Sequence, residues 1–129
     1  MKTSGVENYV PSDIVGGIVA YLKSTRFSGS TETIHTNIAR LRAYYPLLRR
    51  FSFSRHDAFP YSRRLEQALS VLQRSRKSGM ENPDFDTYIV SDEAKSYFQV
   101  EVLPRFTEAE REQLKEIAEV FEAECPPPL

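Results

Sequence analysis

The chain has 129 residues, of which 40% are hydrophobic and 27% are charged. This length and composition fit one globular domain with a continuous core, and they exclude a chain that is disordered overall or embedded in a membrane. The single cysteine, Cys125, excludes an internal disulfide and a multi-cysteine metal site. No stretch approaches the roughly 20 apolar residues that span a bilayer, and the first residues lack the apolar core of a signal peptide, so we expect a cytoplasmic protein.

After an N-terminal arm at residues 1–11, the first predicted helix covers residues 12–24. A Pro-Ser-Asp start precedes apolar residues at helical spacing, which are Ile14, Val15, Ile18, Val19 and Leu22. Gly16 and Gly17 each cost about 1 kcal/mol relative to alanine inside a helix. We therefore expect another element to pack closely against these two glycines.

A turn at residues 27–31 leads into a second predicted helix over residues 31–45. Ser30 or Thr31 can cap this helix by accepting hydrogen bonds from its free N–H groups, and Pro46 marks its end. The apolar stripe of this helix contains Ile34, Ile38, Leu41 and Tyr45.

Residues 46–60 show no sustained period, although Phe51-Ser52-Phe53 alternates like a short strand. We expect four apolar side chains of this segment to be buried, namely Leu47, Leu48, Phe51 and Phe53. Three arginines lie near the phenylalanines of this segment in the sequence, and they are Arg49, Arg50 and Arg55. A single nucleic-acid strand could use such residues for stacking and phosphate contacts, but phenylalanines at this spacing are more often core residues.

The best-defined element is a helix over residues 62–78. Ser62 can cap its start, and Gly79 suits the left-handed residue that closes a helix. One face is apolar and consists of Leu65, Leu69 and Leu72. A turn at residues 80–84 and a β-branched and aromatic run at residues 85–90 then predict a small hairpin.

Two further helices follow the hairpin. Ser91 caps the first, which ends near Pro104 and points Ala94, Tyr97 and Phe98 inward. A T-x-x-E capping box opens the second, an amphipathic helix over residues 107–124 with apolar Leu114, Ile117, Ala118, Val120 and Phe121. This last helix either closes the core or pairs with a second copy of the chain, and an exposed tail at residues 125–129, including Cys125, is expected after it.

Charge is distributed unevenly along the chain, although the formal net charge is only −1. Residues 38–77 carry ten Lys and Arg against two acids, a net charge of +8, whereas residues 78–129 carry a net charge of −9. Such asymmetry indicates a surface that faces a polyanion.

The predicted helix at residues 62–78 carries a polar stripe opposite its leucines. Every member of the stripe can donate hydrogen bonds, and none is acidic. The members are Arg63, Gln67, Ser70, Arg74 and Lys77. A solvated face is the ordinary alternative, but the helix has Glu66 as its one acid, which favours contact with phosphates and base edges. We predict duplex DNA binding through Arg63, Arg64, Gln67, Ser70, Arg74 and Lys77, with Arg40, Arg42, Arg49 and Arg50 as further contacts.

The order of three helices and a hairpin, with Gly79 between the third helix and a strand that ends at Tyr88-Ile89-Val90, resembles the winged-helix superfamily over residues 12–98. The resemblance implies a mainly α fold with a small β-hairpin, a winged-helix-like domain at residues 12–106 and an added C-terminal amphipathic helix at residues 107–124. It also implies that helix 62–78 enters the major groove as the recognition helix of a transcriptional regulator.

Two features depart from this pattern. About fifteen residues separate the second and third predicted helices, where a turn of about three to four is usual. The hairpin carries Glu81, Asp84 and Asp86, which would repel phosphates, so we expect it not to contact DNA. A homodimer formed through the C-terminal helix would let two recognition helices act together.

Other functions find less support in the sequence. His35 and His56 belong to no recognisable catalytic motif and five glycines form no phosphate-binding loop, so we expect no enzyme, no cofactor and no metal. His35 is expected to be a surface or partly buried residue rather than a ligand. The alternative function is a protein–protein interaction module of winged-helix shape that does not bind DNA.

Overall fold

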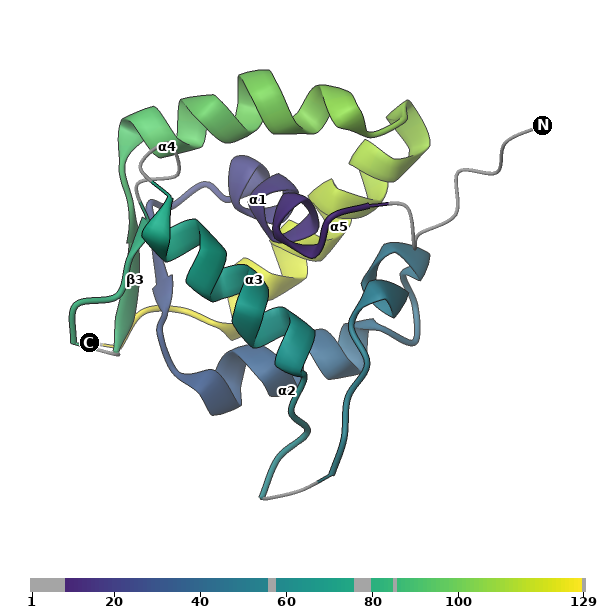
Figure 1. The fold of residues 1–129 in the computed structure, drawn as a ribbon, viewed down its shortest axis with the longest axis vertical. Coiled ribbons are helices and arrows are strands. Elements are labelled where there is room, and N and C mark those ends of the chain that lie inside the picture. Colours follow the sequence, from purple (N-terminus) through teal and green to yellow (C-terminus); the bar gives the residue numbers. More distant parts are fainter. Residues whose placement is uncertain (1–8, 56–57, 76–79, 85, 129) are drawn as a thin grey trace.

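The fold is described from a computed structural model, in which residues 9–55, 58–75, 80–84 and 86–128 are described. Within these ranges the chain is mainly helical with a small antiparallel sheet, which confirms the predicted fold class (Figure 1). The elements in chain order are α1 (Pro11–Tyr21), β1 (Arg26–Ser28), α2 (Thr31–Leu41), the 3-10 helix η2 (Pro46–Arg50), α3 (Arg63–Arg74), β2 (Met80–Glu81), β3 (Thr87–Val90), α4 (Asp92–Tyr97), the π-helical turn η3 (Phe98–Val102), the 3-10 turn η4 (Leu103–Arg105) and α5 (Glu108–Glu124).

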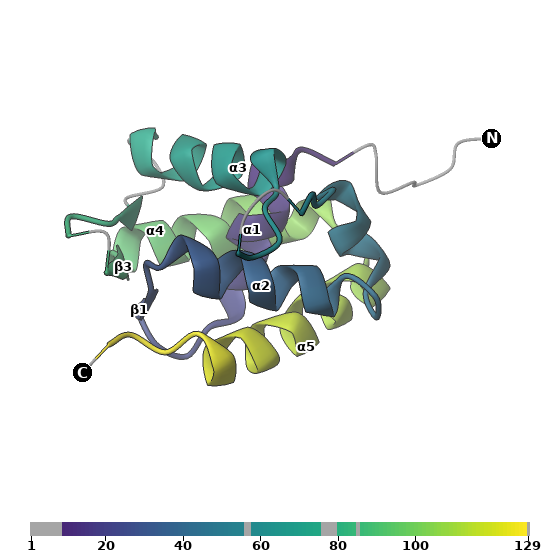
Figure 2. The same cartoon turned by 90° about the horizontal axis from the view of Figure 1, so that it is seen from below.

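Helix α1 lies between α3 and α5, and it contacts both of them (Figure 2). A Cβ atom on Gly16 would lie 3.0 Å from the Phe98 ring, and one on Gly17 would lie 2.8 Å from a methyl group of Leu114. The expected close packing at both glycines is confirmed. The apolar residues of α1 are buried in one cluster with those of α3 and α5, so all three helices share a core.

The sheet has the strand order β1-β3-β2, and both pairs are antiparallel. The predicted hairpin is confirmed, because β2 pairs with β3. The turns predicted at residues 27–31 and 80–84 begin later than expected, because Phe27 and Met80 lie in strands opposite Tyr88 and Val90. Strands of two and three residues are too short to show an alternating pattern.

The segment between α2 and α3 packs on the core without forming the short strand suggested by residues 51–53. Helix α2 ends at Leu41, and Pro46 then opens η2 rather than terminating a longer helix. Buried as expected are Leu47, Leu48 and Phe51, whereas Phe53 is half-buried. The one β-type pairing described within this segment is a bridge between Ser54 and Tyr61.

Helix α5 closes the core. The capping box of Thr107 and Glu110 is present, and four apolar residues are buried as predicted, namely Leu114, Ile117, Ala118 and Phe121. The exposed tail predicted from Cys125 onward is wrong at Cys125, which is fully buried and whose carbonyl accepts a hydrogen bond from the Ser28 N–H at 2.9 Å. Burial raises the pKa of the Cys125 thiol to about 12. Among the described residues, no helix is both long and apolar enough to cross a membrane.

Candidate nucleic-acid interface

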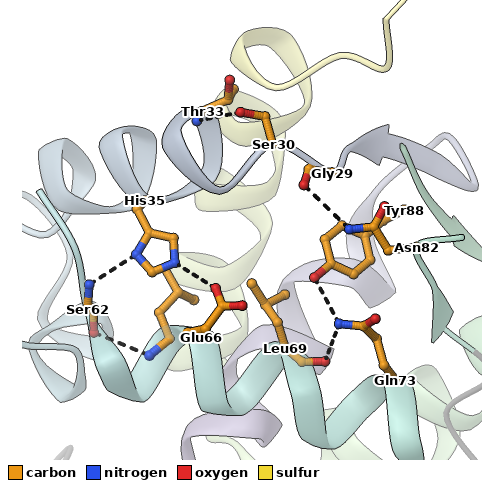
Figure 3. A network of polar contacts seen from close by, with 11 residues as sticks. Gly29, Ser30, Thr33, His35, Ser62, Glu66, Leu69, Gln73, Asn82 and Tyr88 are labelled. Carbon is orange, nitrogen blue, oxygen red and sulfur yellow. Dashed lines mark hydrogen bonds and ion pairs between the residues drawn. The ribbon is translucent and has the colours of Figure 1, made fainter. Parts of the chain in front are cut away.

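The start of α3 is fixed by a residue of α2. The Ser62 hydroxyl caps α3 by accepting from the Leu65 N–H at 3.2 Å, as predicted. The Ser62 N–H in turn donates to Nδ1 of His35 at 3.0 Å (Figure 3). Both residues are fully buried, so α2 sets where α3 begins.

His35 also orients the side chain of Glu66, the one acidic residue of α3. Because Nδ1 accepts a hydrogen bond, Nε2 carries the proton and donates to Oε1 of Glu66 at 3.2 Å. The Tyr61 ring stacks on the imidazole at a centroid distance of 4.8 Å. The expectation of a surface or partly buried His35 is therefore wrong, because its ring is an interior hydrogen-bonding group. Glu66 consequently faces α2 instead of the outer face of α3.

The outer face of α3 is polar and open to solvent. Its inner face buries Leu65, Ala68, Leu69 and Leu72, and the exposed residues are Arg63, Arg64, Gln67, Val71, Gln73 and Arg74, with Ser70 half-buried. No ion pair joins any of these arginines to a carboxylate of the described residues. Helix α3 ends at Arg74, so it is shorter than the predicted 62–78, and Lys77 and Gly79 lie outside the described residues.

Four arginines outside α3 were expected to contribute, and the structure places them differently. Arg49 is exposed on η2, and the Arg50 carbonyl accepts a long hydrogen bond of 3.5 Å from the Arg64 guanidinium. Arg42 instead donates to the Phe51 carbonyl at 2.7 Å and holds the connecting segment. Arg40 forms an ion pair with Glu124 of α5, which neutralises its charge. Arg50 also donates from Nε to the Tyr9 carbonyl at 3.0 Å. Arg49 is thus the exposed arginine beside the start of α3, whereas Arg40, Arg42 and Arg50 have partners of their own.

The phenylalanines of the connecting segment are directed inward. Phe51 is fully buried, and the rings of Phe53 and Phe59 meet His35 edge-on at centroid distances of 6.3 and 6.5 Å. These rings are therefore engaged within the protein, which weakens the alternative of base stacking by a single strand.

The acidic helix lies on the other side of the molecule. Figure 2 shows α3 and α5 on opposite sides of α1, in agreement with the contacts that α1 makes to each. The exposed acids of α5 are Glu108, Glu112, Glu116, Glu119 and Glu124. Among the described residues, no group of three or more His, Cys, Asp or Glu side chains is arranged to hold a metal ion.

Comparison with known proteins found no match among family models, curated proteins or solved structures.

Proposed function

We propose that the chain is a cytoplasmic, winged-helix-like transcriptional regulator that binds duplex DNA with α3 as its recognition helix. The observation that carries this proposal is the outer face of α3, where Arg63, Gln67 and Arg74 are exposed while Glu66 is bonded to His35. A face with hydrogen-bond donors and no free carboxylate suits the acceptors on phosphates and on base edges in the major groove.

The arrangement of elements supports this reading. The chain runs helix, strand, helix, helix and then hairpin, and the strand before α2 completes the sheet in the order β1-β3-β2. The hairpin follows α3 as in the pattern on which the resemblance rests. The long α2–α3 connection departs from that pattern, but its last residue, Ser62, is the one that fixes the start of α3.

The residues divide into two roles in this proposal. Arg63, Gln67 and Arg74 would reach base edges or phosphates from the groove-facing side of α3. Arg49 and Arg50 would contact the phosphate backbone beside its first turn. The acids of α5 would orient the molecule by turning away from the duplex.

The experiment is a titration of random-sequence and selected duplexes by fluorescence anisotropy at several salt concentrations. Log affinity should fall linearly with log salt, by a slope of roughly 0.9 for each phosphate neutralised. The double variant Arg63→Glu/Arg74→Glu should weaken binding by about a hundredfold or more, since it reverses two contacts. A matched control, Lys23→Glu/Lys115→Glu, makes the same change in net charge at exposed lysines, one of them on α5, and should bind within about threefold of the wild type.

Failure to bind at low salt, a response independent of salt, or equal losses in both double variants would contradict the proposal. The first result would favour the alternative of a protein–protein interaction module. Selection of bound duplexes from a random pool tests the proposed homodimer, because a palindromic motif would reflect twofold symmetry.

A further inference from the structure

The outer faces of α3 and α5 carry opposite charges at the same spacing. On α3, the exposed Arg63 and Arg74 lie on the face opposite the buried leucines. On α5, an acidic stripe runs opposite the buried residues of that helix and consists of the exposed Glu108, Glu112, Glu116 and Glu119. Arg63 and Arg74 are eleven residues apart, as are Glu108 and Glu119, so each pair spans about 16 Å along its helix. Two charges of one helix can therefore face two of the other at once.

The acidic stripe of α5 is not neutralised by its surroundings. Glu108 and Glu119 form no ion pair with a described residue. Glu116 accepts a hydrogen bond at 3.1 Å from the Tyr45 hydroxyl, which carries no charge. Lys115 is the one exposed basic residue of α5, and the helix contains seven glutamates against two basic residues. Excess negative charge therefore remains on this face.

The two faces cannot meet within one molecule. Arg63 and Arg74 form no ion pair with a described carboxylate, and Glu66, the one acid of α3, is bonded to His35. Figure 2 shows α3 and α5 on opposite sides of α1, which contacts both of them. The positive face of α3 can therefore reach an acidic stripe of this kind only on a second copy of the chain.

We propose that the outer face of α3 binds the acidic stripe of α5 on a second copy of the chain, with Arg63 and Arg74 paired to Glu108 and Glu119. The contact joins unlike faces on opposite sides of the molecule, so it is head to tail, leaves a free face at each end and is distinct from a twofold dimer. Exposed ion pairs are weak and screened by salt, so the association is reversible. It covers the face proposed to bind DNA, and a bound duplex would displace it. The inference does not require that the chain bind DNA.

The test is sedimentation equilibrium of the full-length chain without nucleic acid. Protein concentrations extend to about 1 mM, at which even a weak complex is populated. The salt concentrations are about 0.01 M and about 1 M, at which the Debye length is about 30 Å and about 3 Å. At low salt the weight-average mass should rise with concentration beyond that of a dimer, and the association constant should fall by about tenfold or more at high salt. A monomer at low salt, a mass that stops at the dimer, or association that salt leaves unchanged would overturn the proposal.

Charge reversal identifies the faces that meet. Arg63→Glu/Arg74→Glu makes both faces acidic, and Glu108→Arg/Glu119→Arg makes both faces basic. Each variant alone should associate about tenfold more weakly or less still, because like charges then oppose each other. An equimolar mixture of the two variants should associate as the wild type does, since the acidic faces of one then meet the basic faces of the other.

The matched control is Glu81→Arg/Glu101→Arg, which makes the same change in net charge as the α5 variant at exposed acids outside both helices. It should associate as the wild type does, and an equal loss in this control would overturn the proposal. Undiminished association in either face variant, or a mixture of folded variants that stays monomeric, would also overturn it. If circular dichroism shows that Glu108→Arg/Glu119→Arg does not fold, Glu112→Arg/Glu119→Arg takes its place with the same expected loss and rescue.

Discussion

Helices α3 and α5 pack against the same central helix from opposite sides, yet they present opposite surfaces to solvent (Figure 2). Each buries an apolar face, with Leu65 in α3 and Leu114 in α5 among the most deeply buried residues. The outer face of α3 exposes arginines and turns its acid inward, whereas that of α5 exposes several glutamates. Both helices therefore pack by burying leucines, and the difference between them lies in the charge of their outer faces.

The two helices also begin in different ways. The first turn of α5 is capped locally, because Thr107 and Glu110 satisfy each other's backbone N–H groups. The first turn of α3 depends on Ser62, whose own N–H is held by His35 of another helix. Both helices thus carry a local cap, but the cap residue of α3 is itself held by a hydrogen bond to a residue of α2.

The largest loss of stability is expected from truncating a buried leucine, and it tests whether α5 belongs to the core as fully as α3 does. Leu114→Ala and Leu65→Ala should each reduce the free energy of unfolding by about 2–5 kcal/mol, because each leaves a cavity in the buried core. Urea unfolding followed by circular dichroism measures both. Val100→Ala, at a residue that is 63% exposed, is the control and should change stability by less than about 0.5 kcal/mol. A loss below about 1 kcal/mol for Leu114→Ala alone would show that α5 is peripheral.

The next largest loss of stability is expected from breaking the hydrogen bond between the Ser62 N–H and His35. His35→Ala leaves the Ser62 N–H buried without an acceptor, and we expect a loss of about 2 kcal/mol in the free energy of unfolding. His35→Asn places an acceptor near the position of Nδ1 and should recover part of this loss. Urea unfolding gives the stabilities, and hydrogen exchange of the Ser62 and Leu65 amides reports the local change. Equal losses in both variants would argue against the role assigned to Nδ1.

Local signals explain most of what could be predicted of the fold. The caps at Ser30, Ser62, Ser91 and Thr107 each involve a donor three residues further on, so a short stretch of sequence contains the whole interaction. Strand β1 could not be found this way, because its partner β3 lies far along the chain and the pairing covers three residues. The burial of Cys125 likewise depends on contacts with Ser28 and Thr33 of distant elements.

In the candidate interface too, some features follow from the local sequence and others depend on distant contacts. Arg63, Gln67 and Arg74 follow from helical periodicity, which the structure reproduces in α3. The ion pair of Arg40 with Glu124 joins α2 to the end of α5 and carries no signal in the local sequence. Val71 is exposed beside the polar stripe, although an apolar residue in a helix usually indicates the core.

A smaller effect concerns the local start of α5. Thr107→Ala removes the hydroxyl that accepts from the Glu110 N–H, and the expected loss is about 1 kcal/mol in the free energy of unfolding. Thr107→Ser keeps the hydroxyl and should lose much less. Because this cap is local, exchange of the Leu65 amide in α3 should change no more than the global stability does. If Thr107→Ala accelerates exchange of the Leu65 amide by more than the global loss of stability accounts for, the caps of α3 and α5 are not independent.

The smallest effect is a pH dependence that α5 should show through Glu110. Burial alone would raise the pKa of Glu110, but hydrogen bonds from the Tyr9 hydroxyl and from Thr107 outweigh it and lower that pKa in the folded protein. A carboxyl whose pKa is lowered on folding stabilises the protein above its unfolded pKa of about 4.3, and this stabilisation is lost as pH falls through the folded value. Between pH 6 and pH 3 the wild type should therefore lose more free energy of unfolding than Glu110→Gln, as urea titrations at both pH values would measure. The control is Glu112→Gln, at an exposed acid on the same helix, which should lose as much free energy of unfolding between the two pH values as the wild type does. An equal loss in Glu110→Gln and in the wild type would show that Glu110 does not cause the pH dependence.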